Sequence, residues 1–400
     1  MNAMNDVYTF INEGLVAYIS LQVDDFSQDV FSLCQDLNCL LNKNVNSDYA
    51  KHLKNNSTDI KNKIWALFDC LSKNLYVNMY ILFDLLSLYQ ENTRIDNDKY
   101  RDHYYHSVQC FLLGLSLCAL HPVLINKFNT ERGVYPNITT IFFMLFLYHD
   151  LGYLYNTKDA DRINETIRTW LLDVDLESRI VVERIRTIFE LRDLPEEIIA
   201  EFARNEDLNS IWKQPVNETD RLLLKDHFSI SRTPCDVEKH HSYDSAAVLY
   251  RFVRTKDLLS GLSLGGLSEG TLCPEIDKRK EQFFEVIKSI LFHDFNIQSE
   301  LLLENEFLAC LLMLADEIQN YGRSYQDEKY NNKIILPTKV GLEITSNNKL
   351  NLVLDENFVN MLDAETQKSY RNYTTNYVYD VLSNKIDSSD LDLIFERNEK

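Results

Sequence analysis

Glycine and proline are scarce in this chain, whose 400 residues include only 10 glycines and 7 prolines. Both residue types interrupt helices, because glycine loses much backbone entropy on folding and proline removes a hydrogen-bond donor. Apolar residues recur at helical spacing over residues 5–40 and 58–92. The composition and the spacing together predict a mainly α fold.

Basic residues are also in deficit, with 41 lysines and arginines against 61 aspartates and glutamates, which gives a formal net charge of −20. A surface this acidic repels phosphate backbones and anionic lipid, so we expect no nucleic-acid duplex and no membrane surface as a partner. A small phosphorylated substrate stays compatible, because a metal ion can supply the local positive charge.

Three features of the sequence argue against a zinc–thiolate protein, a secreted protein and a membrane-spanning protein. None of the eight cysteines forms a CxxC pair, which argues against a zinc site built from thiolates alone. The N-terminus has no basic stretch before its apolar residues, as a secretory signal would have. The longest apolar run, Ile138–Tyr148, is too short to span a bilayer. These features predict a reduced, cytoplasmic protein.

Changes in composition divide the chain into three predicted units. Residues 1–95 form a helical N-terminal unit, and residues 96–325 form a second helical block with a charged, amphipathic insertion at 156–235. Residues 326–400 predict a small β-hairpin, turning at Asn347–Asn348, and a last helix over 356–384. The glycine-rich segment 259–270 is either a lid over a site or a connector.

Histidines and aspartates cluster at apolar helices within the second unit. Any one of them, taken alone, fits an ordinary core histidine or a charge at a helix end. Together they are costly to bury unless they are paired or bind metal, and several helices of a bundle can converge on one metal site. Imidazole and carboxylate suit Zn, Mn, Fe or Ni better than Ca. The candidates are His103 and His106, His149 and Asp150, His241, His293 and Asp294, and Asp316 and Glu317.

The order H…HD…H…H…D resembles that of the HD superfamily of metal-dependent phosphohydrolases, over about residues 100–325. The matching residues are His106 in "HYYHSVQCFLLG", His149 and Asp150 in "FLYHDLG", His241 in "KHHSYDSA", His293 in "ILFHDF" and Asp316 in "LLMLADEIQ". The resemblance implies an all-α core in which the first divalent metal is held by His106, His149, Asp150 and Asp316. It also implies a second metal on His241 and His293, bridged by Asp150. The neighbouring His240 stays open as an alternative to His241.

The resemblance also implies roles for other residues. Asp150 and Asp294 are the expected catalytic carboxylates. Asp294 and Glu317 are expected to orient ligands or a water, or else simply to face solvent. His103 is expected beside the metal ligands, with a role as a ligand itself as the alternative. A phosphate substrate also needs positively charged side chains close to the metal ligands. Four basic residues near the ligand segments are candidates, although ordinary solvated surface charge is the simpler interpretation of each. They are Arg101, Lys239, Arg251 and Arg323. His52, His121 and His227 lie outside the pattern and are interpreted as structural.

The predicted reaction is hydrolysis of a phosphate mono- or diester of a nucleotide or small phosphorylated metabolite. Two divalent ions (Mn, Fe, Zn, Ni or Mg) would activate the attacking water. HD-type di-iron oxygenases use the same ligand set and are one alternative. A sensing or scaffold module without catalysis is the other. The flanking units are compatible with a homo-oligomer.

Overall fold

The computed structural model describes residues 7–42, 49–71, 83, 86–87, 103–135, 137–152, 241–254, 282, 285–293, 303, 306–319, 325–326, 334–335, 340–344 and 350–354. Within these ranges the chain is mainly helical, as the sequence predicts. Several predicted features lie outside the described residues. They are the insertion at 156–235, the glycine-rich segment 259–270, the last helix at 356–384, Arg101, Lys239, His227, His240, Asp294 and Arg323. Arg251 lies on a described helix backbone, and its side chain is outside the description.

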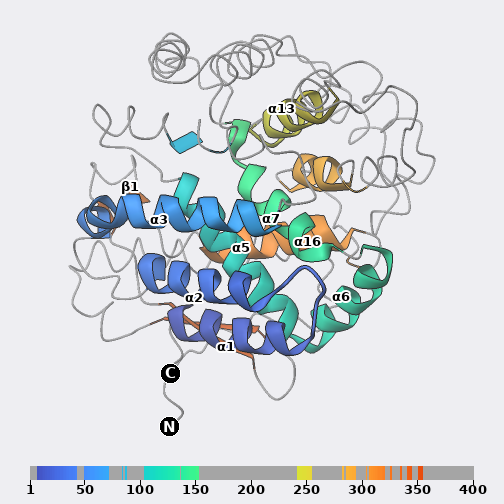
Figure 1. Ribbon diagram of the computed structural model, residues 1–400, viewed down its shortest axis with the longest axis horizontal. Helices are drawn as coiled ribbons and strands as arrows, with labels where there is room; N and C mark the ends of the chain where they lie inside the picture. Colours follow the sequence, from blue (N-terminus) through green and yellow to red (C-terminus); the bar gives the residue numbers. More distant parts are fainter. Residues whose placement is uncertain are drawn as a thin grey trace.

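Helix α5 (His103–Leu120) is the central element of the helical core (Figure 1). Sixteen of its 18 residues are buried. A helix that is buried on all sides needs partners around its whole circumference. The helices that pack against it are α1 (Val7–Ser20), α2 (Gln28–Asn42), α6 (Pro122–Val134), α7 (Ile138–Tyr148) and α16 (Phe307–Gln319). Helix α3 (Tyr49–Leu71) packs against α2, and α13 (His241–Arg254) begins at a predicted ligand.

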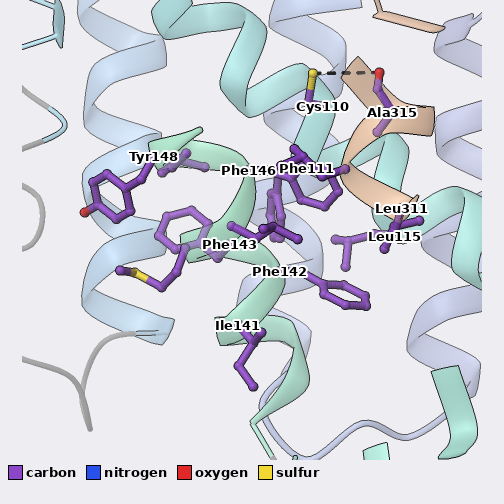
Figure 2. Packing of buried hydrophobic residues seen from close by; sticks show 14 of the residues in the cluster. Cys110, Phe111, Leu115, Ile141, Phe142, Phe143, Phe146, Tyr148, Leu311 and Ala315 are labelled. Atoms are coloured by element: carbon purple, nitrogen blue, oxygen red, sulfur yellow. Dashed lines mark hydrogen bonds between the residues drawn. The ribbon is translucent and has the colours of Figure 1, made fainter. Parts of the chain in front are cut away.

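Helix α7 is fully buried, and its aromatic residues fix its position against α5 (Figure 2). The ring of Phe143 packs edge-on against Phe111 at 5.2 Å and against Phe68 at 4.7 Å between ring centroids. Phe146 lies so close to Gly114 that a Cβ at this glycine would collide with the ring. The helix that ends at the predicted HD pair is therefore held rigidly along its length.

The N-terminal helices contribute directly to the position of α7. Asp25, between α1 and α2, accepts hydrogen bonds from the backbone N–H groups of Thr139 (3.2 Å) and Thr140 (2.7 Å). These N–H groups lie in the first turn of α7, where no partner exists within the helix and where a carboxylate is favoured by the helix dipole. The Tyr18 and Thr139 hydroxyls are also hydrogen bonded, at 3.1 Å.

Two antiparallel strand pairs follow the helices. Strand β1 (Tyr325–Gln326) pairs with β2 (Ile334–Ile335), and β3 (Val340–Ile344) pairs with β4 (Leu350–Leu354). Leu342 lies opposite Leu352 in the second pair, and β3 packs against α1. The connection between β3 and β4, with its predicted turn, lies outside the described residues.

Among the described helices, none alone has the length and apolarity needed to cross a membrane. Helices α5 and α6 meet those criteria only when taken together, with a bend of 101° between them.

Candidate metal centre

The structure brings all six predicted metal ligands to one place in the helical core. Each comes from the end or face of a different element, except for the adjacent HD pair. They are His106 on α5, His149 and Asp150 after the last residue of α7, His241 at the start of α13, His293 at the end of the segment 285–293, and Asp316 on α16. Residues more than 200 positions apart in the sequence are therefore neighbours. His106 and Asp316, for example, are hydrogen bonded to each other.

One half of this cluster is formed by His106, His149 and Asp316. The Nε2 atom of His106 lies 2.7 Å from Oδ1 of Asp316, and Nε2 of His149 lies 3.7 Å from the same oxygen. Ligand bonds of about 2.0–2.2 Å at tetrahedral angles would separate two donors by roughly 3.4 Å. The separation of 3.7 Å between His149 and Asp316 is close to this value. The separation of 2.7 Å between His106 and Asp316 is that of a direct hydrogen bond, and the two atoms would move apart if an ion bound between them.

The other half is formed by Asp150, His241 and His293. Oδ1 of Asp150 lies 3.8 Å from Nε2 of His241 and 3.4 Å from Nε2 of His149. The His293 ring lies 5.3 Å from the His241 ring and 5.4 Å from the His149 ring, between centroids. The donors of His149, Asp150 and His293 lie within 4.8 Å of one another, close enough to surround one ion.

Backbone carbonyls fix the orientation of two of these imidazoles. Nδ1 of His149 lies 2.7 Å from the carbonyl oxygen of Phe146, and Nδ1 of His293 lies 2.6 Å from that of Ile290. A carbonyl oxygen only accepts, so Nδ1 is the donor in each ring, and Nε2 is the atom available for a metal. The side chain of His149 is fully buried, and its Nε2 makes no hydrogen bond of good geometry, its nearest acceptor being Oδ1 of Asp150 at 3.4 Å. Buried polar atoms normally have a hydrogen-bond partner, so a buried Nε2 without a well-formed hydrogen bond is available to bind a metal ion.

The charges of the cluster balance one another in the absence of metal. Burial alone would lower the pKa of His149, but the carboxylates of Asp150 and Asp316 outweigh it and raise this pKa to about 9. Burial would raise the pKa of Asp150, but His149, His103 and His106 hold it well below its usual range. At neutral pH the metal-free cluster therefore retains a proton that a divalent ion would displace.

His103 contacts the cluster from the preceding turn of α5. Its Nδ1 lies 2.8 Å from Oδ2 of Asp150, and both side chains are buried. The sequence predicts that His103 orients a metal ligand. A hydrogen bond to the Asp150 carboxylate is the kind of contact through which it could do so. Glu317, predicted for a similar role, is buried beside Asp316 on α16.

The backbone at Gly152 lies very close to the backbone at the start of α13. A Cβ at this position would collide with the backbone of His241, and the Gly152 N–H donates to Oγ of Ser245 at 2.7 Å. Gly152 lies in the short segment that follows α7 and the HD pair. The structure gives it a role there, because only a residue without a side chain lets His241 approach Asp150.

Cys110 is a potential ligand that the sequence reasoning missed. Its Sγ lies 3.4 Å from Nε2 of His106, and the two residues are four apart on α5. That spacing places them on one helix face, which is the signal that could have identified it. The donors of His106, Cys110, His149 and Asp316 all lie within 4.8 Å of one another.

Comparisons of the chain with protein-family models, with curated proteins and with solved structures found no match. The structure itself shows a buried cluster of histidine, aspartate and cysteine side chains that could hold a metal ion. The imidazole nitrogens and carboxylate oxygens of this cluster lie close enough together to share an ion.

Proposed function

We propose that this protein is a metal-dependent phosphohydrolase that acts on a phosphate mono- or diester of a nucleotide or small phosphorylated metabolite. One observation carries the proposal. Six residues that occur in the order H…HD…H…H…D, spread over 211 positions from His106 to Asp316, converge in one buried cluster. That order is the one that resembles the HD superfamily of phosphohydrolases.

Asp150 lies between the two halves of the cluster. Its Oδ1 faces His149 and His241, whereas its Oδ2 faces His103 and His106, the latter at 4.0 Å. Oδ1 thus lies near one imidazole of each half, so this carboxylate is placed to reach an ion in either half. His103, by donating to Oδ2, would hold this carboxylate in one orientation.

Bound divalent ions would neutralise charge on the phosphoryl oxygens and make a water more acidic, which is the chemistry that ester hydrolysis at neutral pH requires. The chain's own contribution is to hold the donors rigidly. Helix α7 fixes His149 and Asp150 through its packed aromatic residues, and the carbonyl of Phe146 fixes the imidazole. A rigid ligand set keeps the reacting groups in place without reorganisation.

Metal content is the first test of this proposal. The wild-type chain, purified without added metal and then reconstituted, should hold about two equivalents of Mn, Fe, Zn or Ni. His149→Ala and Asp150→Ala should each lose most of this metal. His52→Ala is the matched control, because the His52 ring donates from Nε2 to the Leu40 carbonyl oxygen at 2.8 Å, and within the described ranges its hydrogen bonds lie in the N-terminal helices.

Hydrolysis is the second test. The loaded wild type should release phosphate or nitrophenol from p-nitrophenyl phosphate, bis-p-nitrophenyl phosphate or a panel of nucleotides, and the two cluster variants should not. Bound iron with turnover that consumes dioxygen would replace the proposal with an oxygenase. A wild type that binds no metal after reconstitution would leave a helical scaffold and refute the enzymatic function.

A further inference from the structure

Four potential ligands of different chemical character meet at one end of the cluster. They are two imidazoles, a carboxylate and a thiol, from His106, His149, Asp316 and Cys110. The other half of the cluster, around Asp150, His241 and His293, contains no sulfur donor among the described residues. The two halves therefore present different donor atoms to an ion.

The thiol of Cys110 is directed across the interface between α5 and α16 (Figure 2). Its Sγ donates weakly to the carbonyl oxygen of Ala315 at 3.8 Å, the residue that precedes Asp316. The sulfur lies 3.4 Å from Nε2 and 3.6 Å from Nδ1 of His106. It thus lies beside the imidazole ring, next to the oxygen and nitrogen donors.

These distances suit a shared ion after a small rotation. An ion bonded to sulfur at about 2.3 Å and to nitrogen at about 2.0–2.1 Å, at a tetrahedral angle, separates the two donors by roughly 3.5 Å. The Sγ to Nε2 separation of 3.4 Å already matches this. The near-equal distance to Nδ1 shows that the sulfur is off the Nε2 lone-pair axis, so Cys110 must turn about its Cα–Cβ bond. The turn would break its long contact to the Ala315 carbonyl.

A second observation points to an ion within reach of this end, at a nitrogen that both groups of donors share. The Nε2 atom of His149 is fully buried and makes no hydrogen bond of good geometry, although carboxylate oxygens of Asp150 and Asp316 lie 3.4 Å and 3.7 Å away. Its other ring nitrogen donates to the Phe146 carbonyl. The Nε2 atom belongs to the same group of four donors as Cys110. A polar atom in this environment is costly unless a ligand satisfies it.

We propose that Cys110 is a sulfur ligand of the ion held by His106, His149 and Asp316, which makes this half of the centre selective for a thiophilic divalent metal. The inference rests on the metal centre of the proposed function and specifies its chemistry. Thiolate favours Zn²⁺, Co²⁺ or Fe²⁺ over Mg²⁺ and Mn²⁺, which prefer oxygen donors. On binding, the metal replaces the thiol proton, which leaves to solvent.

Cobalt spectroscopy of the full-length chain tests this ligand directly. Co²⁺ is titrated into metal-free wild type, Cys110→Ser and Cys118→Ser. Cys118 is the matched control, because it is buried on the same helix and belongs to no group of metal donors among the described residues. Wild type and Cys118→Ser should develop the near-ultraviolet thiolate-to-cobalt charge-transfer band. Cys110→Ser should lose this band while keeping the visible d–d bands of bound cobalt.

Metal selectivity provides a second readout. The Zn²⁺ dissociation constant of Cys110→Ser should rise by about tenfold or more, whereas that for Mn²⁺ should change by less than about threefold. If Cys110→Ser does not fold, X-ray absorption of zinc-loaded wild type tests the sulfur ligand instead. A bound Cys110 should appear as one sulfur neighbour of zinc at about 2.3 Å.

Three outcomes would overturn the inference. They are cobalt bound to wild type without the charge-transfer band, a band that survives in Cys110→Ser, and a zinc shell of nitrogen and oxygen alone. The first and third leave the metal centre and its phosphohydrolase activity intact. A wild type that binds neither cobalt nor zinc would refute the sulfur ligand, and one that binds no divalent metal at all would also refute the proposed function.

Discussion

Replacing Gly152 by alanine tests whether the second half of the cluster depends on the close approach of α13. The added Cβ would collide with backbone atoms of His241, which cannot rotate away as a flexible side chain could. Residue 152 or the start of α13 must therefore move. Movement also breaks the buried hydrogen bond from the Gly152 N–H to Ser245, which measures 2.7 Å.

The expected loss of stability follows from these two contacts. Overpacking in a tight core costs about 1–3 kcal/mol. Loss of a buried hydrogen bond adds about 1 kcal/mol. We therefore expect the free energy of unfolding of Gly152→Ala to fall by roughly 2–4 kcal/mol in urea titrations. Because His241 moves relative to Asp150, metal analysis should show one ion retained at the His106 end and the other lost.

Gly133→Ala is the matched control. No atom lies within 4 Å of a Cβ built there, near the end of α6, and alanine is the better helix former by about 0.8–1.0 kcal/mol. This variant should bind metal as the wild type does and be equally or slightly more stable. The reasoning is refuted if Gly152→Ala keeps both metals at unchanged affinity and loses less than about 0.5 kcal/mol.

Three further predictions concern residues around the centre. Asp25→Ala removes the carboxylate that caps α7 and should cost about 1–2 kcal/mol in urea unfolding, while the exposed neighbour Asp24→Ala should cost almost nothing. Burial raises the pKa of Glu306 from its ordinary 4.5 to about 7, so the native state binds this proton more tightly than the unfolded chain does. The free energy of unfolding should thus fall by up to about 3 kcal/mol between these pH values, and Glu306→Gln should remove this part of the pH dependence. His103→Ala frees one oxygen of the HD aspartate and should weaken metal binding by about 10- to 100-fold, whereas His52→Ala should not.

Each of these predictions has an outcome that contradicts it. Equal stabilities of the Asp25 and Asp24 variants would show that the cap contributes nothing to α7. A Glu306→Gln variant with the same pH profile as the wild type would exclude this carboxylate as the group that titrates. Unchanged metal affinity in His103→Ala would show that the hydrogen bond to Asp150 does not orient the ligand.

The helical class and the identity of the candidate ligands were predictable from local features of the sequence. Few glycines and prolines and an apolar repeat determine helices whatever their neighbours are. Buried histidines and aspartates at the ends of apolar helices are rare enough to be recognised as a set. The order of His106, His149, Asp150, His241, His293 and Asp316 needed no coordinates.

Only the tertiary structure decided which atoms face one another. The hydrogen bonds that the first turn of α7 donates to the Asp25 carboxylate join segments about 115 residues apart, and no local pattern predicts such a pairing. The same holds for the collision that reserves position 152 for glycine. The four-residue spacing of His106 and Cys110 places both on one helix face, but this spacing alone does not separate a packed thiol from one that binds metal. The difference arises from α16, which brings Asp316 to the same face from 206 residues away, and such contacts depend on how whole helices pack.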